Sequence, residues 1–220
     1  MAAAFPEKAT QKGNDSGRRP THFLALKITD LALKSNIQNF LDKAERRHPE
    51  YRQAFVPQEK LHVTLACLRL SDQAEIVHAV DEFWKLESLL TARHNPANIS
   101  LKVAGTCSFR ESILYADVKE EGSAQRSRQS FVNMVRTLRR LMSNAGVEVT
   151  DIDRPFEPHV TLIKLTRGFT QTSGIAKLDP RILELDKNKV FGVQQVQDIY
   201  LMKMGGSGDE YQVEASVNFR

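Results

Sequence analysis

Two copies of one short motif contain the residues best suited to chemistry. The tetrapeptide His-Val-Thr-Leu occurs at residues 62–65 and again at 159–162, one copy in each half of the chain. Side chains alternate between the two faces of a β-strand, so in each copy the histidine and the threonine share one face, and the valine and the leucine share the other. Two such strands side by side would bring four polar groups to a single cleft: those of His62, Thr64, His159 and Thr161.

These four groups suit cleavage of a phosphodiester by a neighbouring ribose hydroxyl. The reaction needs a base for the nucleophile and an acid for the leaving oxygen. Histidine, with an ordinary pKa of ~6.5, serves in both roles near neutral pH. Threonine hydroxyls donate hydrogen bonds to the non-bridging oxygens, where negative charge builds up. Neither histidine has a carboxylate or cysteine at metal-ligand spacing, so we expect no metal ion and no cofactor. A single copy would more simply be a strand histidine paired with a neighbour, and the duplication favours catalysis.

The elements that must position these residues follow from hydrophobic periodicity. Period-2 segments alternate with segments of helical spacing, and no long linker interrupts them, which predicts one α+β domain over residues 20–220. Residues 1–19 are polar and glycine-containing and are expected to be a disordered tail. The predicted strands cover 22–28, 61–68, 99–103, 113–118, 147–149, 158–165, 196–204 and 211–219, and the predicted helices 33–44, 71–86, 123–142 and 180–188.

Composition and charge are those of an intracellular globular protein. Of 220 residues, 41% are hydrophobic and 26% charged, and no apolar run approaches the ~20 residues of a membrane span. The amino terminus lacks an apolar stretch of signal-peptide length. The two cysteines, Cys67 and Cys107, do not have CxxC spacing, so a reducing compartment, cytoplasmic or nuclear, is expected. The net charge of +4 fits either a phosphate-bearing ligand or a basic solvated surface.

Longer stretches around both motifs resemble a known family. They are Pro-Thr-His-Phe-Leu (20–24), Leu-His-Val-Thr-Leu (61–65), Gly105-Thr106 and Phe-Glu-Pro-His-Val-Thr-Leu-Ile-Lys-Leu (156–165). The doubled His-x-Thr motif is similar to that of the 2H phosphoesterase superfamily, and the flanking segments resemble the phosphoesterase-like central domain of A-kinase anchoring proteins. The resemblance implies a two-lobed, pseudo-symmetric α+β fold, whose antiparallel sheets form a central cleft with the helices packed outside.

The resemblance also implies a function. We expect a metal-independent 2′,5′-phosphodiesterase that cleaves short oligonucleotides, above all 2′,5′-oligoadenylate. The alternatives are a phosphodiesterase of RNA ends or 2′,3′-cyclic nucleotides, and a non-catalytic scaffold domain that binds AMP. The expected partner is an oligonucleotide or nucleotide, and no membrane is expected. The anchoring proteins carry a helix that docks on the kinase regulatory subunit, whereas this sequence stops at Arg220, so kinase anchoring is not expected.

Four further residues are candidates for binding the substrate. Phe156, three residues before the second histidine, either stacks on a base or anchors its loop in the core. Tyr115 has an aromatic counterpart in the resembling domains and is either a cleft residue or a core tyrosine. Phe109 and Arg110 precede the strand of Tyr115, where a loop would overhang the cleft. Arg110 either meets phosphate or is a plain surface arginine.

Other side chains are expected to lie outside the site. Strand parity places Lys164 on the face opposite His159, and it places Cys67 with the buried side chains of its strand as an inert thiol. His22 is expected at an exposed strand end, and Trp84 in the core. A run of arginines on one helix is interpreted as a solvated face rather than a nucleic-acid site: Arg126, Arg128, Arg136, Arg139 and Arg140.

Overall fold

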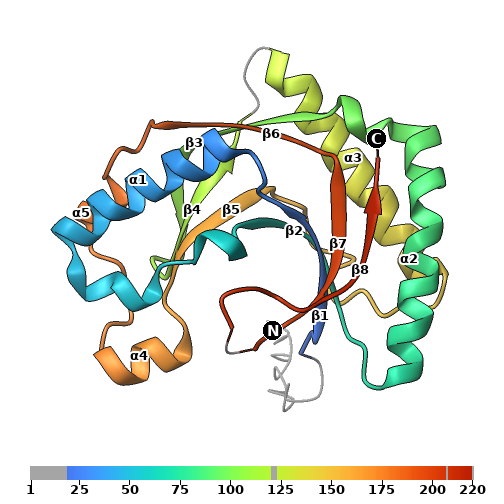
Figure 1. Ribbon diagram of the computed structural model, residues 1–220. Helices are drawn as coiled ribbons and strands as arrows, with labels where there is room; N and C mark the ends of the chain where they lie inside the picture. Colours follow the sequence, from blue (N-terminus) through green and yellow to red (C-terminus); the bar gives the residue numbers. More distant parts are fainter. Residues whose placement is uncertain (1–18, 120–122, 207, 220) are drawn as a thin grey trace, which may run out of the picture.

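Two antiparallel four-stranded sheets form the centre of the molecule (Figure 1). The computed structural model describes residues 19–119, 123–206 and 208–219, so the expected disordered tail lies outside the described residues except for Arg19. The first sheet has the order β2-β1-β7-β8, formed by His62–Leu68, His22–Lys27, Asp198–Lys203 and Val213–Asn218. The second has the order β5-β4-β3-β6, formed by His159–Lys164, Ile113–Val118, Ser100–Phe109 and Val190–Gln195.

Helices pack on the outside of the two sheets (Figure 1). α1 (Leu31–Arg47) contacts β6, while α2 (Gln73–His94) contacts α3 and β8, and α3 (Ser123–Asn144) contacts β3 and β2. The predicted α+β class is confirmed, and none of the described helices is long and apolar enough to cross a membrane. The short elements are α4 (Arg167–Ser173), α5 (Pro180–Leu183) and the 3₁₀ helices η2 (Pro49–Ala54), η3 (Gln58–Lys60) and η4 (Pro96–Asn98).

Capping residues and apolar periodicity account for the helices. The Asp30 carboxylate accepts a hydrogen bond from the Leu33 amide at 2.7 Å and so begins α1. Asp72 caps α2, so the helix begins at Gln73 rather than at residue 71 as predicted. Trp84 is 55% exposed, so its expected place in the core was wrong. The apolar face of α2 uses other positions: Ala79, Phe83, Leu86 and Leu90.

Two of the strand expectations also need correction. His22 is 2% exposed because β1 lies between β2 and β7 in its sheet, so that His22 pairs with Leu68 on one edge of the strand and with Lys203 on the other. The predicted strand 147–149 is reduced to one isolated bridge between Val149 and Leu68. The closing hairpin of β7 and β8 is present as predicted, with paired residues from Asp198 to Met202.

β2 and β5 each contain a β-bulge directly after the threonine of the motif. In β2, Thr64 pairs with Ala25 and Ala66 pairs with Leu24, so Leu65 has no partner across the strand. In β5, Thr161 pairs with Tyr115 and Ile163 with Leu114, so the leucine between them is the extra residue. An extra residue reverses the side-chain alternation that follows it. The third residue after each threonine therefore returns to the threonine's own face.

Candidate active site

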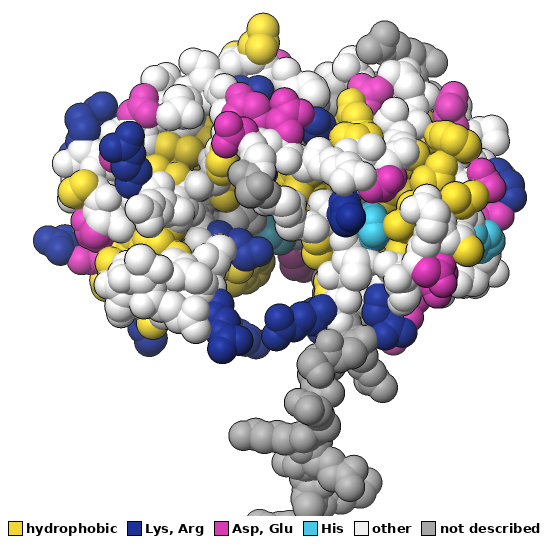
Figure 2. All heavy atoms as spheres, turned by 60° about the horizontal axis from the view of Figure 1, so that its bottom comes forward, with side chains coloured by type: hydrophobic (Ala, Val, Ile, Leu, Met, Phe, Trp, Pro, Cys, Tyr) yellow, Lys and Arg dark blue, Asp and Glu magenta, His cyan; other side chains and the backbone are white. Residues whose placement is uncertain are grey.

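One pocket of about 360 Å³ receives both His-Thr pairs. His62 and Thr64 come from β2 in the first sheet, and His159 and Thr161 come from β5 in the second. Apolar walls are supplied by Val56 and Ile113, together with Phe23, Met204, Gly205 and Tyr211. Figure 2, which views the face that carries α4 and the β7–β8 loop, shows a deep hollow between the two halves with Lys and Arg side chains along its rim. The structure thus brings the four motif residues together.

Each histidine is held in the same way by its own chain. The Nδ1 atom of His62 lies 2.6 Å from the carbonyl oxygen of Lys60, and that of His159 lies 2.8 Å from the carbonyl oxygen of Glu157. Because a carbonyl oxygen only accepts hydrogen bonds, Nδ1 is the donor in both contacts. Nε2 is then the nitrogen available for chemistry. On His62 it lies 3.1 Å from the Thr64 hydroxyl.

Two aromatic rings flank each histidine. The ring of His62 lies 5.1 Å from that of Phe23 and 5.4 Å from that of Tyr211, centre to centre. The ring of His159 lies 5.0 Å from Phe109 and 5.1 Å from Tyr115. Phe109 and Tyr115 are themselves stacked at 4.3 Å. The aromatic pairs therefore repeat the pseudo-symmetry of the motifs, one pair in each half of the cleft.

Burial lowers the pKa of His62 and raises that of Tyr115. Loss of solvent around the imidazole lowers the pKa of His62 to about 4, and the nearby positive charges of His159 and Lys164 lower it further, against the hydrogen bond to Lys60. His62 is therefore neutral at pH 7. Burial also raises the pKa of Tyr115 to about 12, so its phenol keeps its proton throughout the physiological range.

Lys164 lines the pocket, contrary to the parity argument. The bulge at Thr161–Ile163 shifts the alternation by one residue, so the ammonium group returns to the face of His159 and Thr161. The same shift in β2 turns Cys67 toward the face of His62, where it is only half-buried rather than enclosed in the core. Burial nevertheless raises the pKa of the Cys67 thiol to about 11.

Two of the predicted substrate-binding residues, Phe109 and Tyr115, contact the His159 ring without lining the pocket, and the other two lie elsewhere. Phe156 is half-buried against Phe131, with ring centres 5.7 Å apart and the Arg139 guanidinium 5.3 Å above it, and it lines a different cavity. Arg110 is exposed in the β3–β4 turn, where its φ of 51° is left-handed. The two aromatic residues that line the pocket, Phe23 and Tyr211, were not predicted from the sequence.

The expected solvated arginine face of α3 is only partly correct. Arg126, Arg136 and Arg140 are exposed. Arg139 is 6% exposed, and its guanidinium donates to three backbone carbonyls and to the Asp151 carboxylate. Within the described ranges, no cluster of three or more His, Cys, Asp or Glu side chains is arranged to hold a metal ion.

Comparison with known proteins places the chain in a family. Residues 20–219 match the model of the AKAP7 2′5′ RNA ligase-like domain. Human A-kinase anchor protein 7 isoform gamma is 22% identical over 203 residues, which cover 90% of this chain but only 57% of that protein. The chain thus spans little more than half the length of this relative.

Solved structures share the fold over nearly the whole chain. E. coli LigT complexed with 3′-AMP superposes with a TM-score of 0.58 at 16% identity, over 90% of this chain and 97% of that one. TT0787 of Thermus thermophilus gives a TM-score of 0.56 at 18% identity, over 91% and 98%. The two-lobed arrangement of antiparallel sheets with outer helices is therefore the LigT-like fold, and the chain belongs to the family of AKAP7 2′5′ RNA ligase-like domains, within the 2H phosphoesterases.

Proposed function

We propose that this protein is a metal-independent phosphodiesterase that cleaves short 2′,5′-linked oligonucleotides, with 2′,5′-oligoadenylate as the preferred substrate. The family supports a phosphodiesterase-type activity in general. The observation that carries the proposal is the meeting of two His-Thr pairs in one pocket, each histidine with Nδ1 tied to a backbone carbonyl. The LigT complex with 3′-AMP supports a nucleotide as the ligand class.

The two histidines take different roles in the proposed first step. The neutral His62 accepts at Nε2 the proton of the ribose 3′-hydroxyl, which attacks the phosphorus of the adjacent 2′,5′ linkage. His159 donates a proton from Nε2 to the departing 5′ oxygen. The products are a 2′,3′-cyclic phosphate and a 5′-hydroxyl. The reverse reaction exchanges these roles, which accords with a family whose model is described as RNA ligase-like.

The phosphate is held by groups that do not exchange protons. The hydroxyls of Thr64 and Thr161 lie in the pocket beside the histidines, and with substrate bound they donate to the non-bridging oxygens. The Thr64 hydroxyl, which donates to Nε2 of His62 in the free protein, turns to the phosphate and leaves that nitrogen open to the ribose hydroxyl. The Lys164 ammonium, which lines the same pocket, offsets the negative charge that grows there during attack. A bound phosphate anion next to His62 also raises the pKa of that histidine, which makes it a stronger base once the substrate is in place.

Product analysis of a defined substrate tests the proposal. A 2′,5′-linked adenylate trimer and its 3′,5′-linked isomer are incubated separately with the protein in excess chelator, and products are resolved by chromatography and mass spectrometry. We expect the 2′,5′ trimer to yield a cyclic phosphate and a 5′-hydroxyl fragment. A 2′,3′-cyclic nucleotide and an RNA with a terminal phosphate are incubated in the same way. If only these are cleaved, the protein is a phosphodiesterase of RNA ends or cyclic nucleotides. Binding without turnover of any substrate would favour the AMP-binding scaffold.

A further inference from the structure

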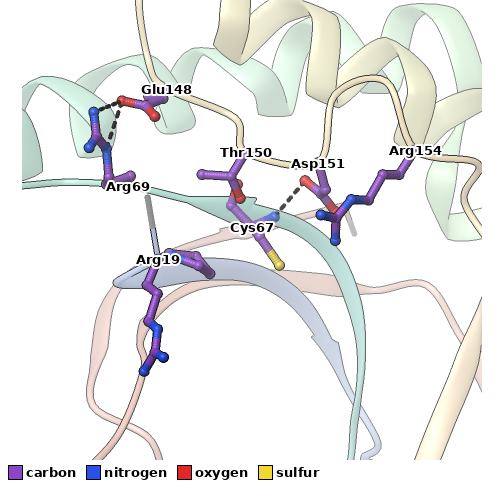
Figure 3. Close-up of a pocket in the computed structure, with 8 residues that line it drawn as sticks. Arg19, Cys67, Arg69, Glu148, Thr150, Asp151 and Arg154 are labelled. Carbon is purple, nitrogen blue, oxygen red and sulfur yellow. Dashed lines mark hydrogen bonds and ion pairs between the residues drawn. The ribbon is translucent and has the colours of Figure 1, made fainter. Parts of the chain in front are cut away.

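The polar face of β2 does not end at Thr64. Because Leu65 is the bulged residue, Cys67 returns to the face that carries His62 and Thr64. At a rise of about 3.3 Å per residue, Cys67 lies roughly 7–10 Å along the strand from Thr64, a distance comparable to the step between successive phosphates of a nucleotide chain. Cys67 also lines a second cavity, of about 680 Å³, which is distinct from the catalytic pocket (Figure 3).

Lys164 lines the catalytic pocket, and its positive charge lowers the pKa of both His62 and Cys67. Cys67, at the edge of the second cavity, lies on the same strand face as Thr64. A ligand that fills the catalytic pocket would therefore reach the second cavity by extending along β2.

The second cavity is basic once its ion pairs are taken into account. Three arginines line it, Arg19, Arg69 and Arg154, against two carboxylates. Both carboxylates are engaged: Glu148 accepts from Arg69 at 2.6 Å, and Asp151 accepts from the Cys67 amide at 2.9 Å and from Arg139 at 2.8 Å. Figure 3 shows the Arg69–Glu148 pair at one side of the cavity and Asp151 next to Cys67.

Arg154 is the arginine of this cavity that we consider best placed to bind an anion. Its backbone is fixed, since its amide donates to the Asp151 carbonyl at 3.1 Å and its own carbonyl accepts from Arg139 at 3.1 Å. Its side chain is exposed, and in Figure 3 it extends from its loop toward Asp151. Among the described residues, no carboxylate lies within ion-pair distance of its guanidinium. A fixed backbone with an unengaged guanidinium is a favourable arrangement for binding an anion.

We propose that this cavity binds a second phosphate group of the oligonucleotide, with Arg154 as its main ligand and Arg19 at the rim. The inference rests on the proposed function and adds to it that the preferred substrate carries at least two phosphates. The thiol of Cys67, whose pKa is raised by burial, stays neutral and does not repel the phosphate. The second phosphate is either the next internal linkage or a terminal 5′-phosphate, because both present the same anion.

Binding measurements with matched ligands separate these cases. Isothermal titration calorimetry is performed in a His159→Ala background, so that no ligand is cleaved. The three probes are 2′,5′-ApA, with one phosphate, 5′-phosphorylated pApA, with a terminal second phosphate, and the 2′,5′ trimer ApApA, with an internal one. We expect at least one of the two-phosphate ligands to bind about 10-fold more tightly than ApA.

Substitution of Arg154 should remove this gain. In Arg154→Gln, the two-phosphate ligands should bind no better than ApA, while the affinity for ApA stays unchanged; Arg154→Lys, which keeps the charge, should retain most of the gain. Arg46→Ala, which removes an exposed arginine from the last turn of α1, should behave like the parent. An undiminished gain in Arg154→Gln would overturn this inference and leave the proposed function standing. If none of the three probes binds to the His159→Ala protein, both this inference and the proposed function are wrong.

Discussion

The Nδ1 atom of His62 lies 2.6 Å from the carbonyl oxygen of Lys60, a contact that decides which ring nitrogen is free to exchange protons with a substrate. His159 makes the equivalent contact with Glu157. In both cases the carbonyl belongs to the residue two positions earlier, so the constraint is local and comes with the strand. The tautomer is therefore set by the backbone, and Nε2 is left as the acid–base atom at both ends of the cleft.

Replacement of either histidine by alanine should lower turnover of the 2′,5′ trimer by 10²–10⁴-fold, because each substitution removes one proton-transfer step. The fold should persist, since both side chains line the pocket and their removal enlarges it without leaving an enclosed cavity. The double variant should be far less impaired than the product of the two single effects, because base and acid act on one transition state. Single-turnover rates on protein checked by circular dichroism measure this.

Substitution of the motif threonines should lower the rate of turnover less than substitution of the histidines. Thr64→Ala and Thr161→Ala should each lose about one charge-assisted hydrogen bond, ~1.5–3 kcal/mol of transition-state stabilisation. A His159→Ala variant that kept more than about a tenth of the parent rate would contradict the paired acid–base assignment.

Activity should persist in millimolar chelator, because two imidazoles, two hydroxyls and Lys164 supply proton transfer and charge stabilisation in the pocket. The measurement is the initial rate after dialysis against chelator, and again after addition of single divalent ions. A rate that is lost on dialysis and restored by one particular ion would show that the reaction runs through a metal.

The pH dependence of kcat/KM should reveal the depressed pKa of His62. This parameter reports the ionisation of the free protein, and burial, with help from His159 and Lys164, lowers the pKa of His62 to about 4. The base is lost only when it is protonated, so the acid limb should lie well below the pH of 6.5 at which an ordinary histidine titrates. Lys164→Met removes a positive charge that opposes protonation, so the limb should move to higher pH. A limb that shifts to lower pH in this variant would refute the assignment of His62 as the base.

Alanine substitutions at Phe109 and Phe156 should have different effects, the first on substrate binding and the second on stability. Phe109, which is 36% exposed and stacked on Tyr115, should on replacement by alanine raise KM by about 5- to 10-fold with little change in the midpoint of unfolding. Phe156→Ala should instead cost about 2–3 kcal/mol of stability, because the ring packs on Phe131, and should leave KM nearly unchanged. Trimer kinetics and urea unfolding on both variants decide between the roles. Reversed effects would return Phe156 to the substrate site.

Strand parity predicted the motif faces but failed just beyond them. A period of two correctly placed His62 with Thr64 and His159 with Thr161 on the polar side of their strands. It failed for Lys164 and Cys67 because the bulge in each strand adds one residue and reverses the alternation of faces after it. The bulged residues, Leu65 and Leu162, do not differ in the sequence from ordinary strand leucines. No local pattern in the sequence marks such a bulge. Its cause lies in contacts made by other segments.

Long-range packing also explains the other failures. Tyr211 reaches His62 only because the β7–β8 loop folds back over the cleft, where the Lys60 ammonium donates to the Gly208 carbonyl at 2.5 Å. The glycines of that loop predicted a turn but not its direction. Phe23 belongs to a strand with apolar residues on both faces, so periodicity alone did not show which face meets the cleft.

Arg139 holds the bulge of β2 in place, and its loss should be among the most destabilising single changes in the domain. Its Nε donates to the carbonyl of Leu65, the bulged residue, at 2.7 Å, and its Nη2 pairs with Asp151 at 2.8 Å. The other carboxylate oxygen of Asp151 accepts from the Cys67 amide at 2.9 Å, so the backbone groups that the bulge removes from the ladder are satisfied by this pair.

Arg139→Met should therefore cost about 3–5 kcal/mol of unfolding free energy, because a buried carboxylate and several carbonyls lose their partner. Arg140→Ala, the exposed neighbour on the same helix, should change the unfolding free energy by less than about 0.5 kcal/mol. Urea unfolding followed by tryptophan fluorescence measures both. The double variant Arg139→Met with Asp151→Asn should recover part of the loss, since it also removes the unpaired charge. Equal stability of Arg139→Met and Arg140→Ala would mean that the bulge is held by the strand pairing alone.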